Sequence, residues 1–142
     1  MWSHGGFTIS TDPAHLDVPL IHRFLRDESY WAAGVPRKIV DQAIVGSLNV
    51  GLFSGDPARG DATQIGYARV VTDRATFAWL CDVFVLPTHR GKGLATWLIG
   101  SLSRVADSCA STRRTEREAR RSASDDRHLD STYGLRPVSR TG

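Results

Sequence analysis

The chain has 142 residues, of which 41% are hydrophobic and 23% are charged. This length fits one domain, and a globular domain of this composition can fold without disulfides or structural metal ions. The formal net charge of +3 is small, and no apolar run approaches the ~20 residues of a membrane-spanning helix, which argues against a membrane protein. We therefore expect a single domain over residues 1–142.

The N-terminal segment and the cysteines both indicate a cytoplasmic protein. The first ten residues lack the basic and apolar regions of a secretory signal. Cys81 lies in an apolar run and Cys109 in a serine-rich stretch, and their spacing suggests neither a metal site nor a redox motif. We expect reduced thiols, a cytoplasmic location and no metal ion.

The first third of the chain predicts one strand and two helices. Residues 7–10 favour a short strand. Asp17 is a suitable N-cap for a helix with Pro19 in its first turn, and Pro36 can begin a second helix after a loop at 30–35. Apolar residues recur at helical spacing in both segments, so each helix has one face suited to burial. These residues are Leu20, Ile21, Phe24, Leu25, Ile39, Val40, Ala43 and Ile44.

The period of the pattern then changes from helix to strand. Residues 48–53, 65–71 and 77–86 each favour a strand, and the short turn at 73–76 joins the last two as a hairpin. A third helix is expected to begin at residues 90–93, with apolar residues at helical spacing behind it. The first hundred residues therefore predict an α/β domain with an antiparallel meander.

The composition changes after about residue 107. Residues 108–127 contain few large apolar side chains, although an α/β domain would place a buried strand there. We expect this stretch to be irregular or disordered, with a strand over 133–138 after it. The arginines of 113–121 are mixed with acidic residues and lack interleaved aromatics, so no nucleic-acid partner is expected.

The most informative segment is the junction at residues 82–95, where a strand runs into a glycine-containing turn that begins a helix. The first amides of a helix have no intrahelical partners, and the helix dipole adds positive potential there. Gly91 and Gly93 remove the Cβ atoms that would keep an anion from the backbone, and Arg90 and Lys92 add positive charge. The third glycine of a dinucleotide fold and the Gly-Lys-Ser/Thr of a Walker motif are both absent. A tight turn that uses glycine for its geometry alone is the structural alternative.

Residues 90–95, Arg-Gly-Lys-Gly-Leu-Ala, match the acyl-CoA signature Arg/Gln-x-x-Gly-x-Gly/Ala, so the chain resembles the GNAT superfamily of N-acetyltransferases. Residues 65–73 and 82–87 are similar to the strands that precede that signature, and residues 24–36 resemble small bacterial members. The resemblance covers about residues 7–106. It implies an α/β (α+β) fold whose mixed, mostly antiparallel sheet is flanked by helices, with an acyl-CoA-binding site at the strand-turn-helix around residues 82–95.

The resemblance also implies the ligands and the residues that bind them. Acetyl-CoA would be the co-substrate, and its acetyl group would pass to an amine that attacks the thioester directly. Tyr30 and Trp31 would line the acceptor pocket, or would be aromatic cover for the core. The implied contacts of acetyl-CoA are Val83 and Val85 for the pantetheine arm, and Arg90, Gly91, Lys92, Gly93, Leu94 and Ala95 for the pyrophosphate.

Two residues are candidates for proton transfer. Asp82 is the only charged residue of its strand, and alternation places it with Leu80 and Phe84 on the face opposite Val83. A carboxylate there can act as a general base or be a hydrogen-bonded structural residue. Tyr133 is the candidate acid, but the segment 129–135 departs from the family motif. When the segment is aligned with the motif without a gap, the position of the usual acid is occupied by Asp130. Tyr133 is therefore either a displaced acid or a packing tyrosine.

The sequence thus predicts an N-acetyltransferase that uses a small-molecule or peptide amine as acceptor. The divergent C-terminal part favours an alternative, which is a catalytically impaired acyl-CoA-binding or interaction protein of the same origin. Neither interpretation involves a membrane. A weak last strand would leave an exposed sheet edge, and such an edge favours a homodimer.

Overall fold

The computed structural model describes residues 1–109 and 137–138. In this part of the chain, six strands form one sheet in sequence order, and each is antiparallel to its neighbours. The strands are β1 (Trp2–His4), β2 (Phe7–Ser10), β3 (Leu48–Ser54), β4 (Thr63–Thr72), β5 (Ala78–Val85) and β6 (Pro137–Val138).

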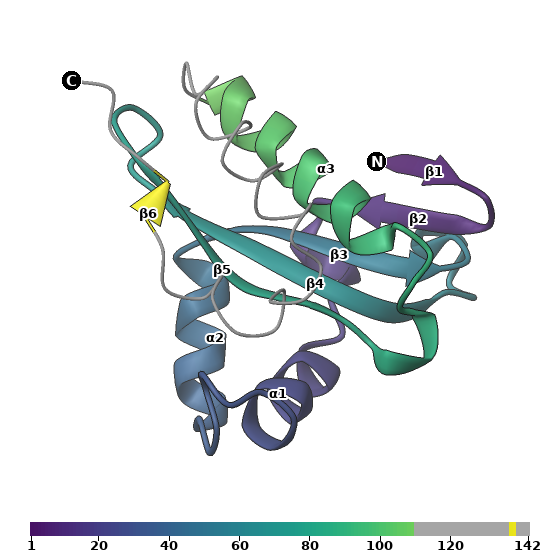
Figure 1. Ribbon diagram of the computed structural model, residues 1–142, viewed down its shortest axis with the longest axis horizontal. Coiled ribbons are helices and arrows are strands. Elements are labelled where there is room, and N and C mark those ends of the chain that lie inside the picture. Colours follow the sequence, from purple (N-terminus) through teal and green to yellow (C-terminus); the bar gives the residue numbers. More distant parts are fainter. Residues whose placement is uncertain (110–136, 139–142) are drawn as a thin grey trace.

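The described α-helices cover both faces of this sheet. Helix α3 (Leu94–Cys109) lies across one face, and α1 (Val18–Asp27) and α2 (Arg37–Val45) lie on the other (Figure 1). Helix α1 begins as the sequence predicts, because the Asp17 carboxylate accepts a hydrogen bond of 3.0 Å from the Leu20 amide. Pro36 is the N-cap residue of α2. Within the described residues, no helix has the length and apolar character that crossing a bilayer requires.

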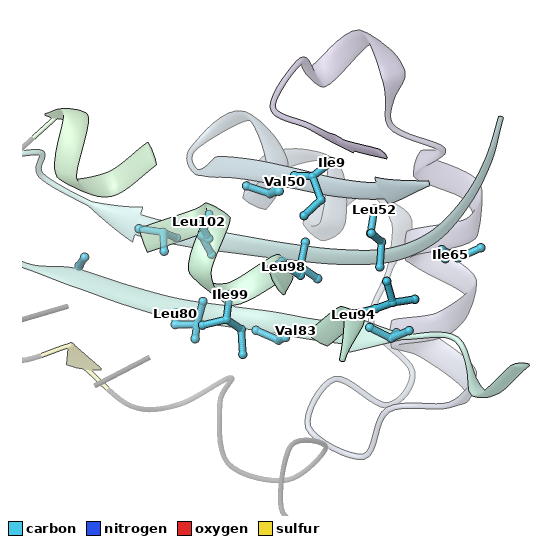
Figure 2. Close-up of a cluster of buried hydrophobic side chains, with 14 residues drawn as sticks. Ile9, Val50, Leu52, Ile65, Leu80, Val83, Leu94, Leu98, Ile99 and Leu102 are labelled. Atoms are coloured by element: carbon cyan, nitrogen blue, oxygen red, sulfur yellow. The ribbon is translucent and has the colours of Figure 1, made fainter. Parts of the chain in front are cut away.

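The apolar side chains form a separate core on each face. Leu94, Leu98, Ile99 and Leu102 of α3 pack on the sheet and are almost fully buried (Figure 2). On the opposite face, the rings of Phe24 in α1 and Phe84 in β5 stack with centroids 3.9 Å apart. Both cores reach β5, so this strand is fixed from both sides.

The architecture confirms the predicted fold class. Each strand and helix expected over residues 7–106 is present within a few residues of its predicted bounds. Strand β1 was not predicted, although Gly5 and Gly6, both at positive φ, form a two-residue turn typical of a β-hairpin. The predicted irregular stretch 108–127 lies outside the described residues except for the end of α3, and only the last two residues of the predicted strand 133–138 are described.

Strand β5 contains a bulge that contradicts the simple alternation predicted for it. Arg69 of β4 faces Cys81 and Tyr67 faces Phe84, so a single β4 residue lies opposite both Asp82 and Val83. Asp82 accommodates the extra residue at φ 52°, a left-handed conformation. After the bulge, each side chain of β5 lies on the face of the sheet opposite to the one that strict alternation predicts.

The prediction that Val83 and Leu80 lie on opposite faces of the sheet was therefore wrong. Both side chains belong to the core under α3. Asp82 and Phe84 face α1 and α2 instead. An extra residue in one strand shifts every later side chain to the other face, which strict alternation does not anticipate.

Candidate active site

The turn between β5 and α3 has the conformation expected of an anion-binding site. Gly91 and Gly93 adopt φ values of 80° and 73°, which residues with a Cβ rarely adopt. A Cβ added at either position would meet no heavy atom of the described residues within 4 Å, so the space above the turn is open. The first backbone bond of the helix runs from the Trp97 amide to the Gly93 carbonyl at 3.1 Å, which leaves the preceding amides without intrahelical acceptors.

A cavity of about 360 Å³ lies over this turn and the end of β5. Its walls combine the strand, the turn and the first turn of α3, and they include both glycines. The lining residues are Val83, Phe84, Val85, His89, Arg90, Gly91, Gly93, Leu94, Ala95 and Thr96.

The two basic residues of the turn have different positions. Arg90 lines the cavity, and its Nε donates a hydrogen bond of 2.9 Å to the Val85 carbonyl, which ties the turn to the strand. Lys92 lies outside the lining, with its Nζ 5.7 Å from the centroid of the Phe7 ring. Of the predicted cofactor contacts, Lys92 alone does not line this cavity.

A second cavity, of about 200 Å³, lies between the sheet and the helices α1 and α2. Most of its lining is apolar and comes from the two helices and the loop between them. Three polar side chains of the sheet complete it, namely Tyr67, Arg69 and Asp82. The remaining lining residues are Ile21, Leu25, Trp31, Ala32, Val35, Ile39, Val40, Ala43 and Ile44.

An ion pair at the β5 bulge forms the polar wall of this second cavity. Arg69 Nε donates to Asp82 Oδ2 at 2.6 Å, and the side chains are only 16% and 12% exposed. Trp31 Nε1 donates to Asp82 Oδ1 at 3.1 Å, so both carboxylate oxygens accept a hydrogen bond. Arg69 also donates from Nη1 to Ser47 Oγ at 3.0 Å. Through these bonds, the α1–α2 loop, the residue just before β3, and β4 are linked to the left-handed residue of the bulge.

Electrostatics keep Arg69 charged and Tyr67 neutral. Burial alone would lower the pKa of the Arg69 guanidinium, but the adjacent Asp82 carboxylate reverses this effect and leaves that pKa raised. Burial raises the pKa of the Tyr67 hydroxyl, which donates to Asn49 Oδ1 at 2.5 Å. The described lining of the second cavity therefore contains one positive and one negative side chain.

The structure brings some of the sequence-predicted residues together and separates others. Trp31 and Asp82 are hydrogen-bonded in the second cavity. Tyr30 does not line it: the residue is 60% exposed, and its ring contacts the Trp31 ring edge to face. Tyr133 lies outside the described residues. Sequence reasoning missed Arg69, although it is the one charged residue of its predicted strand, and that strand was expected to pair with the strand of Asp82.

Cys81, beside the bulge, is expected to react slowly with alkylating reagents. Burial raises the pKa of its thiol to about 11, and the residue is 6% exposed. In a Cys109→Ser variant, Cys81 is the only thiol, and alkylation by iodoacetamide at pH 8 should be about 100-fold slower than for a peptide cysteine, since each pKa unit lowers the thiolate fraction about tenfold. A rate equal to that of the peptide would contradict the burial of this thiol.

The same raised pKa predicts how stability depends on pH. The neutral thiol is favoured in the folded state, so its contribution to stability is complete below pH ~9 and is lost as pH rises through about 11. Urea unfolding at pH 8 and pH 10.5 should show this decline, and a Cys81→Ala variant should show a smaller one. An equal decline in both proteins would exclude Cys81 as its source.

Comparison with known proteins agrees with this geometry and defines the class. Residues 21–123 match the family model of the acetyltransferase (GNAT) family, and the chain belongs to this family. A protein of Gibberella zeae named "Putative acetyltransferase FG08082" is 32% identical over 115 residues, which are 72% of this chain and 65% of that protein. The chain thus spans about two thirds of the length of this curated relative.

Two solved structures share the fold. A GNAT-family protein of Xanthomonas campestris pv. campestris is 41% identical, with a TM-score of 0.65 over 74% of this chain and 70% of that one. The protein SA2161 of meticillin-resistant Staphylococcus aureus is 17% identical, with a TM-score of 0.57 over 73% and 71% of the two chains, and shows likeness of fold alone. No group of three or more potential metal-ligating side chains occurs among the residues placed here.

Proposed function

We propose that the protein is an N-acetyltransferase that moves an acetyl group from acetyl-CoA to an amine. The observation that carries this proposal is the cavity of about 360 Å³ formed by the end of β5, the glycine turn and the start of α3. A pyrophosphate needs donors and positive potential, and a helix start behind two open glycines offers both. Membership of the GNAT family supports the same assignment.

The residues of the turn fit coenzyme A. The amides of Gly91 to Ala95 would donate to the pyrophosphate, and Arg90 would add charge from the cavity wall. The backbone at Val83 and Val85 would contact the pantetheine arm. Among the described strands, β6 pairs with this edge of β5 only at Ala78 and Trp79, and the Val85 carbonyl accepts a hydrogen bond from Arg90.

The acceptor amine would enter through the second cavity. Asp82 lines this cavity, and the next residue, Val83, lines the first one. The amine nitrogen would attack the carbonyl carbon of the thioester, forming the C–N bond as the C–S bond breaks. The amine loses a proton, and the departing thiolate gains one. Holding both substrates in place supplies much of the rate. We assign the proton acceptor to Asp82, the only carboxylate among the described residues that lines either cavity, and keep Tyr133 as the proposed donor.

Calorimetric titration of the purified chain with acetyl-CoA tests the proposal, with free CoA and ATP as comparisons. We expect saturable binding of both CoA forms and much weaker binding of ATP. A folded protein that binds none of them, or binds ATP as tightly, would refute the assignment of the first cavity.

The role of Asp82 is tested by Asp82→Asn, which keeps the shape of the side chain and is tolerated in a left-handed backbone. If Asp82 accepts the proton, kcat should fall by about 10²–10⁴-fold, with acetyl-CoA affinity unchanged. An unchanged rate across the pH range would remove Asp82 from the mechanism.

A specific observation also supports the alternative of an acyl-CoA-binding protein without turnover. Both oxygens of Asp82 already accept hydrogen bonds, from Arg69 and Trp31, as a purely structural aspartate would. Tight CoA binding with no acetylation of any amine would favour this alternative. A cytoplasmic location and a homodimer remain predictions of the sequence.

A further inference from the structure

We infer that the acceptor is a free α-amino acid with an apolar side chain, bound as its zwitterion in the second cavity. This inference rests on the proposed acetyl transfer, since it names the substrate class of that reaction. It follows from the size, the lining and the charges of the cavity.

The size of the cavity favours a small acceptor. At about 200 Å³ it is smaller than the ~300–1,000 Å³ of sites that take drug-sized ligands. A compound of amino-acid size fits such a space. A longer chain would have to continue outside it.

The lining favours an apolar body on that acceptor. Helices α1 and α2 and the loop between them contribute aliphatic side chains around the cavity, among them Ile21, Leu25 and Val40. These three are almost fully buried in the second core, so the walls are fixed by packing. An aliphatic side chain would replace water against these walls, which is favourable in proportion to the apolar area removed from water.

The charges favour an acceptor that carries both signs. Asp82 and Arg69 lie side by side in the lining, 2.6 Å apart, and no other charged residue of the described chain lines the cavity. A carboxylate can accept more bonds than the two that Asp82 accepts here, and a guanidinium has more donors than the two that Arg69 uses. The ammonium group of the amino acid would donate to Asp82 and give up one proton to become the attacking amine, while its carboxylate would meet Arg69. A simple amine would leave Arg69 without an anion from the substrate.

The amine is also placed on the correct side for transfer. Asp82 lines the second cavity, and the next residue, Val83, lines the first. An amine at Asp82 is therefore adjacent to the strand segment that the pantetheine arm would follow.

The test is calorimetric titration of the full chain, with and without saturating CoA, using L-leucine and three compounds that each lack one feature. These are 3-methylbutylamine without the carboxylate, 4-methylpentanoate without the amine, and glycine without the apolar body. We expect L-leucine to bind at least tenfold more tightly than each of them. Equal or tighter binding of 3-methylbutylamine, or of the dipeptide leucyl-glycine, would overturn the inference, as would no binding of L-leucine to protein that binds acetyl-CoA.

Two double variants test whether Arg69 and Asp82 cause the preference for L-leucine. Arg69→Gln/Asp82→Asn removes both charges and keeps polar groups, so the preference for L-leucine over 3-methylbutylamine should disappear. Arg37→Gln/Asp41→Asn removes an exposed pair of α2, joined at 2.9 Å, and should keep the preference. Retention of the preference in the first variant would overturn the proposed site. Binding of L-leucine without binding of acetyl-CoA would instead refute acetyl transfer and support the amino-acid site.

Discussion

Gly93→Asp should weaken the binding of CoA by about 100-fold or more. The new carboxylate would project into the open space above the turn, where the pyrophosphate is expected, because a Cβ at this position would have no atom of the described residues within 4 Å. Like charges brought together in a binding site cost several kcal/mol, which corresponds to a loss of about 100-fold or more in affinity. Calorimetric titration of the variant with CoA and with acetyl-CoA measures this loss.

Gly60→Asp is the matched control for this experiment. Gly60 has φ 77° against 73° for Gly93, and its added Cβ would also have no described neighbour within 4 Å. Both substitutions therefore introduce the same charge and a similar left-handed strain, of about 1–2 kcal/mol, in the folded state. Only the Gly93 variant should lose affinity. Equal binding by the two variants would place the pyrophosphate elsewhere.

Arg69→Met should destabilise the fold by about 3–5 kcal/mol. The substitution leaves the Asp82 carboxylate largely buried without its cation, and removing one partner of a buried pair has an effect of this size. It also removes the bond to Ser47, so β4 loses its side-chain link to the residue just before β3. Urea unfolding followed by circular dichroism gives the difference in free energy.

Two further variants separate the charge from the packing. Adding Asp82→Asn to Arg69→Met removes the uncompensated carboxylate and should recover most of the loss, since asparagine tolerates the positive φ of this position. Arg37→Met breaks an exposed pair whose side chains are 47% and 51% exposed, and should change stability by at most about 1 kcal/mol. A loss in Arg69→Met no larger than in Arg37→Met would contradict the structural role of the buried pair.

Local signals in the sequence determined strands β2 to β5, the three α-helices and the location of the first cavity. Asp17, Pro36 and the apolar periodicity determine where α1 and α2 lie, because caps and helical spacing depend on residues a few positions apart. The glycine turn at residues 91–93 is equally local: strand, glycines and helix start are contiguous, so one stretch of sequence contains the whole site.

The second cavity could be predicted only in part. Trp31 and Asp82 were each identified as candidates, but their hydrogen bond joins residues 51 positions apart. Arg69 and Ser47 reach the same site from two other segments. Tyr30, equally plausible in the sequence, is 60% exposed, and nothing local in the loop sequence distinguishes it from Trp31.

The sequence alone determined the family signature, the antiparallel order of β3, β4 and β5, and the helix that begins behind the glycines. The tertiary structure decided which face of the sheet Asp82 occupies and which residue pairs with it. The reason is the bulge in β5: a single extra residue at φ 52° exchanges the two faces of the strand. Its position depends on how β4 and β5 pair and on how α1, α2 and α3 pack against them. These contacts join residues far apart in the chain, and no local pattern records them.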